Sequence, residues 1–187
     1  MEVRPVRLSG NRVAVLVANE FEDSELAEPV KAMESQGAEV VLIGLSAAAE
    51  QGLIGKHGLV VPADATIDEV NPDDFTALFI PGGRSPSHLR KDERVLQFVR
   101  RINQAQKPIG AICHGPQVLI SSEAGRHHVM TGYPAIAEEF DNVGATYVDK
   151  EVVVDGNIVT SRRPADIPAF IEAFFDLIEK KAKEVAA

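Results

Sequence analysis

The sequence has 187 residues, 45% of them hydrophobic, and carries a formal net charge of −9. The acidic balance argues against nucleic acid and anionic membranes as partners. No apolar run approaches the ~20 residues of a membrane span, and the first residues lack the apolar core of a secretory signal. The single cysteine allows no internal disulfide. We therefore expect a cytoplasmic protein, with a polar lead-in over 1–11 and one domain over 12–187.

A near-continuous apolar run over 12–18 predicts a central parallel strand. A helix is expected over about 23–36, with Asp23 or Ser24 as its N-cap. The acidic residues at its start complement the helix dipole. Glu25 lies within the first turn of this helix and could instead point at the edge of the sheet.

Two further strands are predicted over 38–44 and 77–80, with a short β pairing between 53 and 61. Gly82 and Gly83 follow the strand at 77–80. They indicate either exposed backbone N–H groups near a site or an ordinary tight turn. Periodicity predicts the remaining elements: a helix over 92–106, a strand over 129–131, a helix from 133 to about 140, strands over 146–148, 151–154 and 157–160, and a final helix to about 183.

The only cysteine, Cys113, stands where a strand over 109–112 gives way to a helix that begins near Pro116. Such a strand-to-helix turn, called the elbow below, presents a nucleophile at the carboxyl edge of a sheet. The N-terminus of the following helix favours a thiolate and predicts a lowered pKa for the thiol. A lone cysteine is also commonly a small buried hydrophobe, so both interpretations stay open here.

Strands that alternate with helices indicate an α/β sandwich with a mainly parallel sheet. Binding sites in such sheets lie at the carboxyl ends of the strands. Three candidate loops fall there, over 20–26, 82–88 and 113–117, and their convergence predicts a site. No Cys/His cluster has the spacing of a zinc site, so we expect neither a metal nor a cofactor.

Six stretches match a known family in the expected order: ANEFEDSEL, GKHG, NPDDFTALFIPGGRSP, KPIGAICHGPQVLIS, GYPAI and YVDKEVVVDGNIVTSRRPADIPAF. Through them nearly the whole chain resembles the PfpI family of the ThiJ/PfpI superfamily, which has a class I glutamine amidotransferase-like fold. The resemblance implies a flavodoxin-like three-layer α/β/α sandwich with Cys113 as a nucleophile on a strained elbow. It also implies a homo-oligomer, either a dimer or a hexamer.

The resemblance further implies roles for individual residues. His114 matches the histidine that follows the cysteine in the family's peptidases, and Glu25 matches the carboxylic acid that hydrogen-bonds the cysteine sulfur. The backbone N–H groups of Gly83 and His114 match the oxyanion hole. Three more residues are candidates for supporting the site: Gly82, Ser87 and Tyr133.

One position departs from the family pattern. In the archaeal peptidases of the family, a glutamate supplied by the neighbouring subunit orients the histidine, and the aligned residue here is Ser87. Serine cannot supply the charge that stabilises an imidazolium, so the peptidase triad is incomplete as carried over.

The favoured interpretation is therefore a cysteine-dependent, stress-protective enzyme of the glyoxalase or deglycase type. Its substrate would be a small dicarbonyl attacked by the Cys113 thiolate, with His114 as the general base and Glu25 as a proton donor. Two alternatives remain: an intracellular cysteine peptidase acting on peptides, and a non-enzymatic redox sensor working through Cys113 oxidation.

Overall fold

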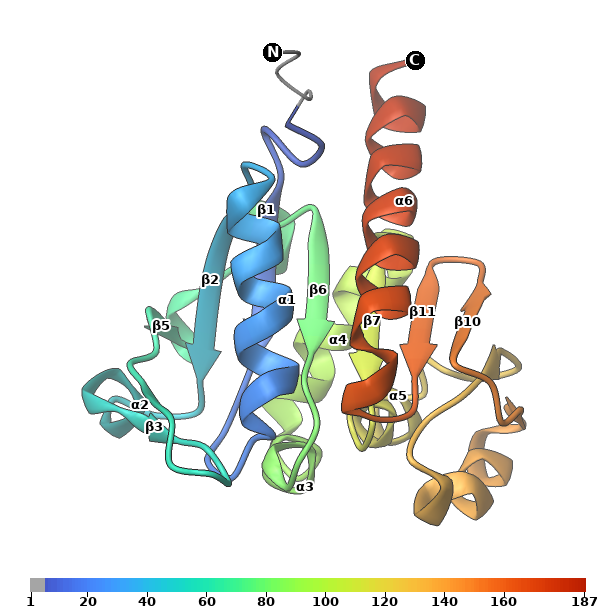
Figure 1. Cartoon of the computed structure of the whole chain (residues 1–187), viewed down its shortest axis with the longest axis horizontal. Coiled ribbons are helices and arrows are strands. Elements are labelled where there is room, and N and C mark those ends of the chain that lie inside the picture. Colours follow the sequence, from blue (N-terminus) through green and yellow to red (C-terminus); the bar gives the residue numbers. More distant parts are fainter. Residues whose placement is uncertain (1–5) are drawn as a thin grey trace.

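The computed structural model describes residues 6–187, and a seven-stranded sheet runs through its centre (Figure 1). All neighbouring strands in this sheet are parallel, except for one antiparallel pair at an edge. In spatial order the strands are β10 (Val152–Asp155), β11 (Ile158–Ser161), β7 (Ile109–Ile112), β6 (Ala77–Ile80), β1 (Arg12–Leu16), β2 (Glu39–Gly44) and β5 (Ala65–Thr66). The antiparallel pair is β10 with β11, the hairpin predicted around Asp155 and Gly156.

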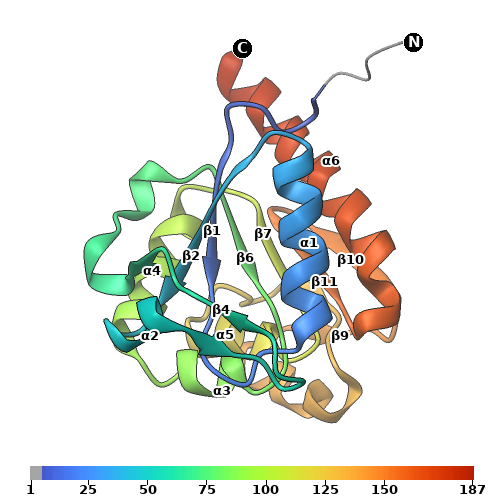
Figure 2. The ribbon, with the colours of Figure 1, turned by 60° about the vertical axis from the view of Figure 1, so that its left-hand side comes forward.

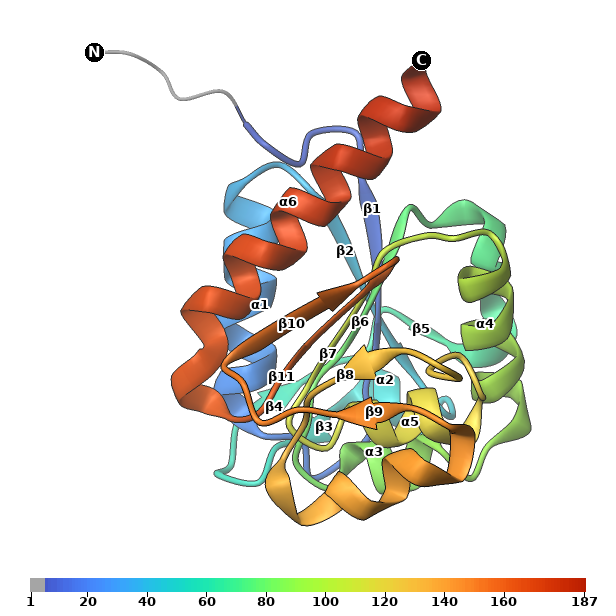
Figure 3. The same cartoon turned by 90° about the vertical axis from the view of Figure 1, so that its right-hand side faces the viewer.

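Helices cover both faces of the sheet. Two long helices, α1 (Asp23–Ser35) and α6 (Ile167–Ala186), lie side by side on one face, and α4 (Glu93–Gln104) lies on the other (Figures 2 and 3). Two short helices, α3 (Ser85–Leu89) and α5 (Pro116–Ser121), join the hydrophobic cluster on the α4 side. The predicted three-layer α/β/α sandwich is confirmed.

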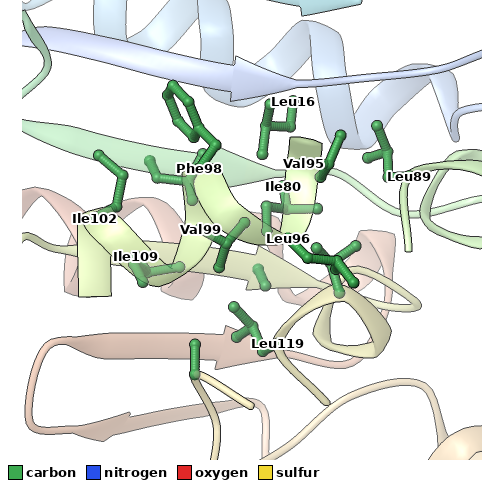
Figure 4. Close-up of a cluster of buried hydrophobic side chains, with 14 of the residues drawn as sticks. Leu16, Ile80, Leu89, Val95, Leu96, Phe98, Val99, Ile102, Ile109 and Leu119 are labelled. Atoms are coloured by element: carbon green, nitrogen blue, oxygen red, sulfur yellow. The ribbon is translucent and has the colours of Figure 1, made fainter. Parts of the chain in front are cut away.

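The central strands are buried on both faces, which explains their near-continuous apolar sequences. In β1, Val13 and Val15 belong to the cluster under α1 and α6, whereas Ala14 and Leu16 belong to the cluster under α4. Figure 4 shows the second cluster, in which Leu16 lies among apolar side chains of β6 and α4. Successive side chains therefore alternate between two cores, as strand geometry requires.

The strand order places the candidate loops together. Among the parallel strands β2, β1, β6, β7 and β11, spatial order against chain order reads 2-1-3-4-5, which is the flavodoxin-like order. The direction of winding reverses between β1 and β6. Loops at the carboxyl ends of strands beside such a reversal form a crevice, and the loops after β1, β6 and β7 end there.

Several local expectations need correction. The first strand ends at Leu16, two residues earlier than predicted. Neither Asp23 nor Ser24 is the N-cap of helix α1: the N-cap position is Glu22, which has no side-chain cap. The Asp23 carboxylate instead accepts hydrogen bonds from the backbone of His57 (3.0 Å) and Leu59 (2.9 Å). The helix expected from 133 to 140 is a 3₁₀ helix, η3 (Pro134–Val143).

Other elements are short. The predicted pairing between 53 and 61 is present as an antiparallel pair, and the strand near 129 pairs with a strand at 146 outside the main sheet. Their bounds, with those of the remaining short elements, are β3 (Leu53–Ile54), β4 (Val60–Val61), β8 (Val129–Met130), β9 (Thr146–Tyr147), α2 (Ala48–Gln51), η1 (Ile67–Glu69), η2 (Pro72–Asp74) and η4 (Pro164–Asp166). The sequence patterns did not predict α2 or α3.

The lead-in predicted over 1–11 lies partly outside the described residues. Of its described part, Leu8 is fully buried, and the Arg7 guanidinium pairs with Asp176 of α6 at 2.7 Å. Residues 7 and 8 therefore pack onto the domain. Within 6–187, no helix is both long enough and apolar enough to cross a bilayer.

Candidate active site

The elbow after β7 holds Cys113 in a left-handed backbone conformation, with φ at 62°. Few non-glycine residues adopt this conformation, and it persists only where the surroundings fix it. Here the Cys113 N–H donates to the Ser161 carbonyl (3.0 Å), and the Cys113 carbonyl accepts from the Tyr133 N–H (2.8 Å). The predicted strained elbow is confirmed.

Backbone hydrogen bonds join the loop after β1 to the loop after β6. The Glu22 N–H donates to the Gly82 carbonyl (3.2 Å), and the Arg84 N–H donates to the Glu20 carbonyl (2.8 Å). The Gly82 N–H in turn donates to Oε1 of Glu25 (3.1 Å), which lies in the first turn of α1. Glu25 therefore points at the sheet edge rather than serving the helix dipole alone.

The two glycines after β6 are required by the close approach of these loops. A Cβ at Gly82 would collide with the Glu25 carboxyl and with the side chain of Cys113. Gly83 has φ at 78°, and a Cβ there would collide with the backbone from Glu20 to Glu22. The backbone N–H groups of Gly83 and His114 lie near enough to the Cys113 sulfur to lower its pKa. The two predicted oxyanion donors thus face the neighbourhood of the sulfur.

Glu25 is completely buried. Burial, together with the negative charge of Glu22, raises the pKa of Glu25 to about 8. At neutral pH its carboxyl is therefore protonated. Its side chain lies near that of Cys113, so that each shifts the pKa of the other, and among the described residues Oε2 has no hydrogen-bond partner. A protonated carboxyl beside the sulfur can donate a hydrogen bond to a thiolate.

The acidity predicted for the Cys113 thiol needs correction. Its side chain is buried, and this burial, together with the charge of an ionised Glu25, raises the pKa of Cys113 to about 12. Hydrogen bonds from the Gly83 and His114 N–H groups act in the opposite direction. The helix that was expected to favour the thiolate, α5, is only six residues long. Protonation of Glu25 removes one of the two opposing effects, so the thiol ionises more readily while Glu25 is neutral.

His114 is placed to accept the thiol proton. Its Nδ1 lies 3.3 Å from the Cys113 sulfur, and its ring stacks on Tyr133 with a centroid separation of 4.8 Å. Partial burial lowers the pKa of His114, so the imidazole is neutral at pH 7. A neutral imidazole next to a protonated thiol is a base–nucleophile pair of the kind found in Cys–His sites.

A cavity of about 840 Å³ opens over these groups, and its lining includes Cys113, His114, Glu25, Gly83, Ser87 and Tyr133. The Ser87 hydroxyl donates to the Arg84 carbonyl (2.6 Å), so it caps its own turn. His88 lies 3.3 Å from the Glu20 carboxylate, and it is not among the residues that line this cavity. Every predicted site residue except Gly82 lines the cavity. Gly82 contributes indirectly, because its N–H donates to the carboxyl of Glu25, which does line it.

Lys56 and Gln117 also line the cavity, although the sequence patterns indicate no role for either. Lys56 comes from the GKHG stretch and lies 3.9 Å from Glu22. Gln117 is three residues after His114, and its N–H donates to the His114 carbonyl (3.0 Å). The motif stretches contained both residues, but only the fold shows that they face the same space as the cysteine.

Comparison with known proteins gives consistent matches. The model of the DJ-1/PfpI family matches residues 11–177. The chain is 45% identical to "Deglycase PH1704" of Pyrococcus horikoshii over 169 residues, 90% of this chain and 99% of that protein. It is 47% identical to "Putative cysteine protease YraA" of Bacillus subtilis over 168 residues, 90% of this chain and 98% of that protein.

Among solved structures, one match is a two-domain protein from Anabaena variabilis with DJ-1/ThiJ/PfpI-like and ferritin-like domains. The TM-score is 0.85 and the identity 37%, and the match covers 89% of this chain and 47% of that one. The elbow cysteine, the flavodoxin-like strand order and these matches agree: the chain belongs to the DJ-1/PfpI family.

Proposed function

We propose that this protein is a cysteine-dependent enzyme for small dicarbonyl compounds and their adducts, of the glyoxalase or deglycase type. The observation that carries the proposal is the position of the Cys113 sulfur. It lies between a neutral base, His114, and a protonated carboxyl, Glu25, at the floor of an open cavity. A nucleophile with both a base and an acid beside it suits addition to a carbonyl.

The reaction with methylglyoxal begins with transfer of the thiol proton to Nδ1 of His114. The sulfur attacks the aldehyde carbon, a C–S bond forms, and the carbonyl oxygen becomes an alkoxide. The N–H groups of Gly83 and His114 stabilise this charge, and the Glu25 carboxyl protonates it to give a hemithioacetal. Base-promoted enolisation then moves the hydrogen on that carbon to its neighbour, while the proton of the new hydroxyl passes to the neighbouring carbonyl oxygen, and the product is a lactoyl thioester. The imidazolium returns its proton to the Glu25 carboxylate. Water then hydrolyses the thioester to lactate and restores the thiol.

The name of the Pyrococcus relative supports deglycase chemistry, in which the same attack would release an amine from an adduct. Peptide hydrolysis is the second candidate. The 3.3 Å contact between the Cys113 sulfur and the His114 imidazole favours it, as does the name of the Bacillus relative. Ser87 stands where the family's peptidases carry the orienting glutamate, which places this activity second.

The test measures lactate formed from methylglyoxal, with the two enantiomers resolved. Catalysis at Cys113 predicts one enantiomer in excess from wild type, and none from Cys113→Ala. Reaction of methylglyoxal with surface lysines and arginines consumes substrate without giving chiral lactate, so this product excludes that artefact. Glu25→Gln should slow lactate formation, because it removes the proton donor. Glu28→Gln is its matched control, because Glu28 lies exposed on the same helix. Lactate formation that persists in Cys113→Ala would disprove the proposal. Oxidation of Cys113 by peroxide without turnover would favour the redox-sensing alternative.

A further inference from the structure

We propose that Glu139 is a positioning residue that acts on His114 within the same chain: its negative charge stabilises the imidazolium, whereas the direct orienting contact made by the family's glutamate is not replaced by Ser87. The catalytic part of this inference rests on the proposed function, because His114 is the general base of the proposed reaction. Its structural part, an electrostatic link between a carboxylate of η3 and the imidazole, can be tested without any substrate.

A chain of hydrogen bonds leads from the elbow to Glu139. Gln117 follows His114 by one turn, and its N–H donates to the His114 carbonyl (3.0 Å). The side-chain amide of Gln117 donates to Oε1 of Glu139 (2.9 Å). The other oxygen, Oε2, pairs with the Arg90 guanidinium at 2.8 Å. Arg90 also donates through Nε to the Ser121 hydroxyl (2.8 Å), so its position is fixed on α5.

The segment that carries Glu139 is attached to the same elbow. Tyr133, directly before η3, stacks on the His114 ring, and its N–H donates to the Cys113 carbonyl. The segment from Tyr133 to Glu139 is therefore held beside the elbow at both ends. One end is fixed by the Tyr133 contacts, and the other by the bonds from Gln117 and Arg90.

Glu139 is a permanent anion at neutral pH. Partial burial opposes its ionisation, but the hydrogen bonds from Arg90 and Gln117 outweigh this and hold the pKa of Glu139 below its ordinary value. The pKa of His114 responds to several neighbours: burial and the positive charge of Lys56 lower it, while the charge of Glu139 raises it.

The other charged or titratable groups around the imidazole do not replace this interaction. Besides Lys56, they are Cys113, Tyr133, Glu25, Glu20, Glu22, Arg84 and Arg90. Glu20 pairs with Arg84 (3.6 Å), and Glu22 lies near His57 (3.1 Å). Glu139 is the carboxylate whose charge raises the pKa of His114. It stabilises the imidazolium that forms when the thiol proton is transferred.

The decisive measurement is the pKa of the His114 imidazole, followed by NMR of ring-labelled histidine and assigned with a His114→Gln variant. Glu139→Gln keeps the size and hydrogen-bonding reach of the side chain but removes its charge. We expect the His114 pKa to fall by at least about half a unit. Glu139→Asp, which keeps the charge, should restore most of the shift. Glu138→Gln is the matched control, because Glu138 is exposed and this substitution removes the same charge one residue away.

The catalytic part is read from the pH profile of kcat/KM on methylglyoxal. Glu139→Gln should lower kcat by about tenfold with little change in KM, and should shift the acid limb toward lower pH. Equal His114 pKa values in Glu139→Gln and Glu138→Gln would overturn the inference. A shifted pKa in a protein that turns over no dicarbonyl would instead preserve the inference and disprove the proposed function. Glu139→Asp keeps the test valid if Glu139→Gln proves unstable.

Discussion

The imidazole of His114 lies 3.3 Å from the sulfur of Cys113, although the two residues are adjacent in the chain. Adjacent side chains on a strand point to opposite faces. Here the positive φ of Cys113 turns the chain, so both side chains reach the same cavity. The strained backbone at Cys113, which costs of order 1–3 kcal/mol, thus brings the nucleophile and the base of two consecutive residues into one site.

Glu25 should control the pH dependence of Cys113 reactivity. Above about pH 8 its carboxyl ionises, and the new charge beside the sulfur opposes thiolate formation. We expect Glu25→Gln to alkylate with iodoacetamide about tenfold faster than wild type at pH 9, with a smaller difference at pH 6. Mass spectrometry of samples quenched at successive times measures the alkylation rate of Cys113 at each pH. Profiles of the same shape in wild type and Glu25→Gln would contradict this role, and Glu28→Gln serves as the control.

Glu25 should also make the protein less stable as the pH rises. Its pKa in the folded state, about 8, lies above the ordinary value of 4.5, so the folded state binds the extra proton between these limits. The stabilising contribution is complete below about pH 4.5 and is lost by pH 8. Full loss corresponds to ~5 kcal/mol. Urea unfolding of wild type and Glu25→Gln at several pH values measures this effect. As the pH rises from 5 to 8.5, the free energy of unfolding of wild type should fall relative to that of Glu25→Gln.

Gly83 should not tolerate a side chain. Gly83→Ala combines a left-handed φ with a collision against the backbone of the β1 loop, and we expect a loss of about 3 kcal/mol together with loss of activity. Gly10→Ala is the matched control. Gly10 has a similar φ of 82° with no atom near the new Cβ, so it should lose only about 1 kcal/mol. Equal losses of stability in the two variants, measured by urea unfolding, would show that the loops after β1 and β6 are not tightly packed.

Features set by residues close together in the chain were predictable from the sequence, whereas features set by contacts between distant segments were not. The elbow at Cys113 was predictable, because a change of hydrophobic period marks where a strand becomes a helix. The role of Asp23 was not, because its carboxylate binds backbone groups of a loop more than 30 residues away. The acidity of Cys113 was predicted with the wrong sign, because the burial of a side chain depends on all three loops that cover it. Glu139 was missed for the same reason: it meets Gln117 only after η3 folds back onto the elbow.

The last prediction concerns peptide hydrolysis. Cleaving an amide requires protonation of an amine leaving group, so it depends more strongly on a well-oriented imidazolium than addition to a dicarbonyl does. In this chain Ser87 lines the cavity but its hydroxyl donates to the Arg84 carbonyl, and it carries no charge. We therefore expect wild type to cleave a fluorogenic peptide weakly or not at all. Loss of an orienting carboxylate can cost ~10⁴-fold in rate.

Ser87→Glu should recover part of that loss and raise peptide cleavage at least about tenfold, while Ser87→Gln, of the same size without the charge, should not. Turnover of methylglyoxal should change much less in both variants. Size-exclusion chromatography checks that the two variants share the assembly of wild type, since the family's glutamate acts across a subunit contact. Robust peptide cleavage by wild type that disappears in Cys113→Ala would reverse the ranking of the two activities. Glu139 would then be the first residue to test as the orienter of His114, because its charge is already coupled to that ring.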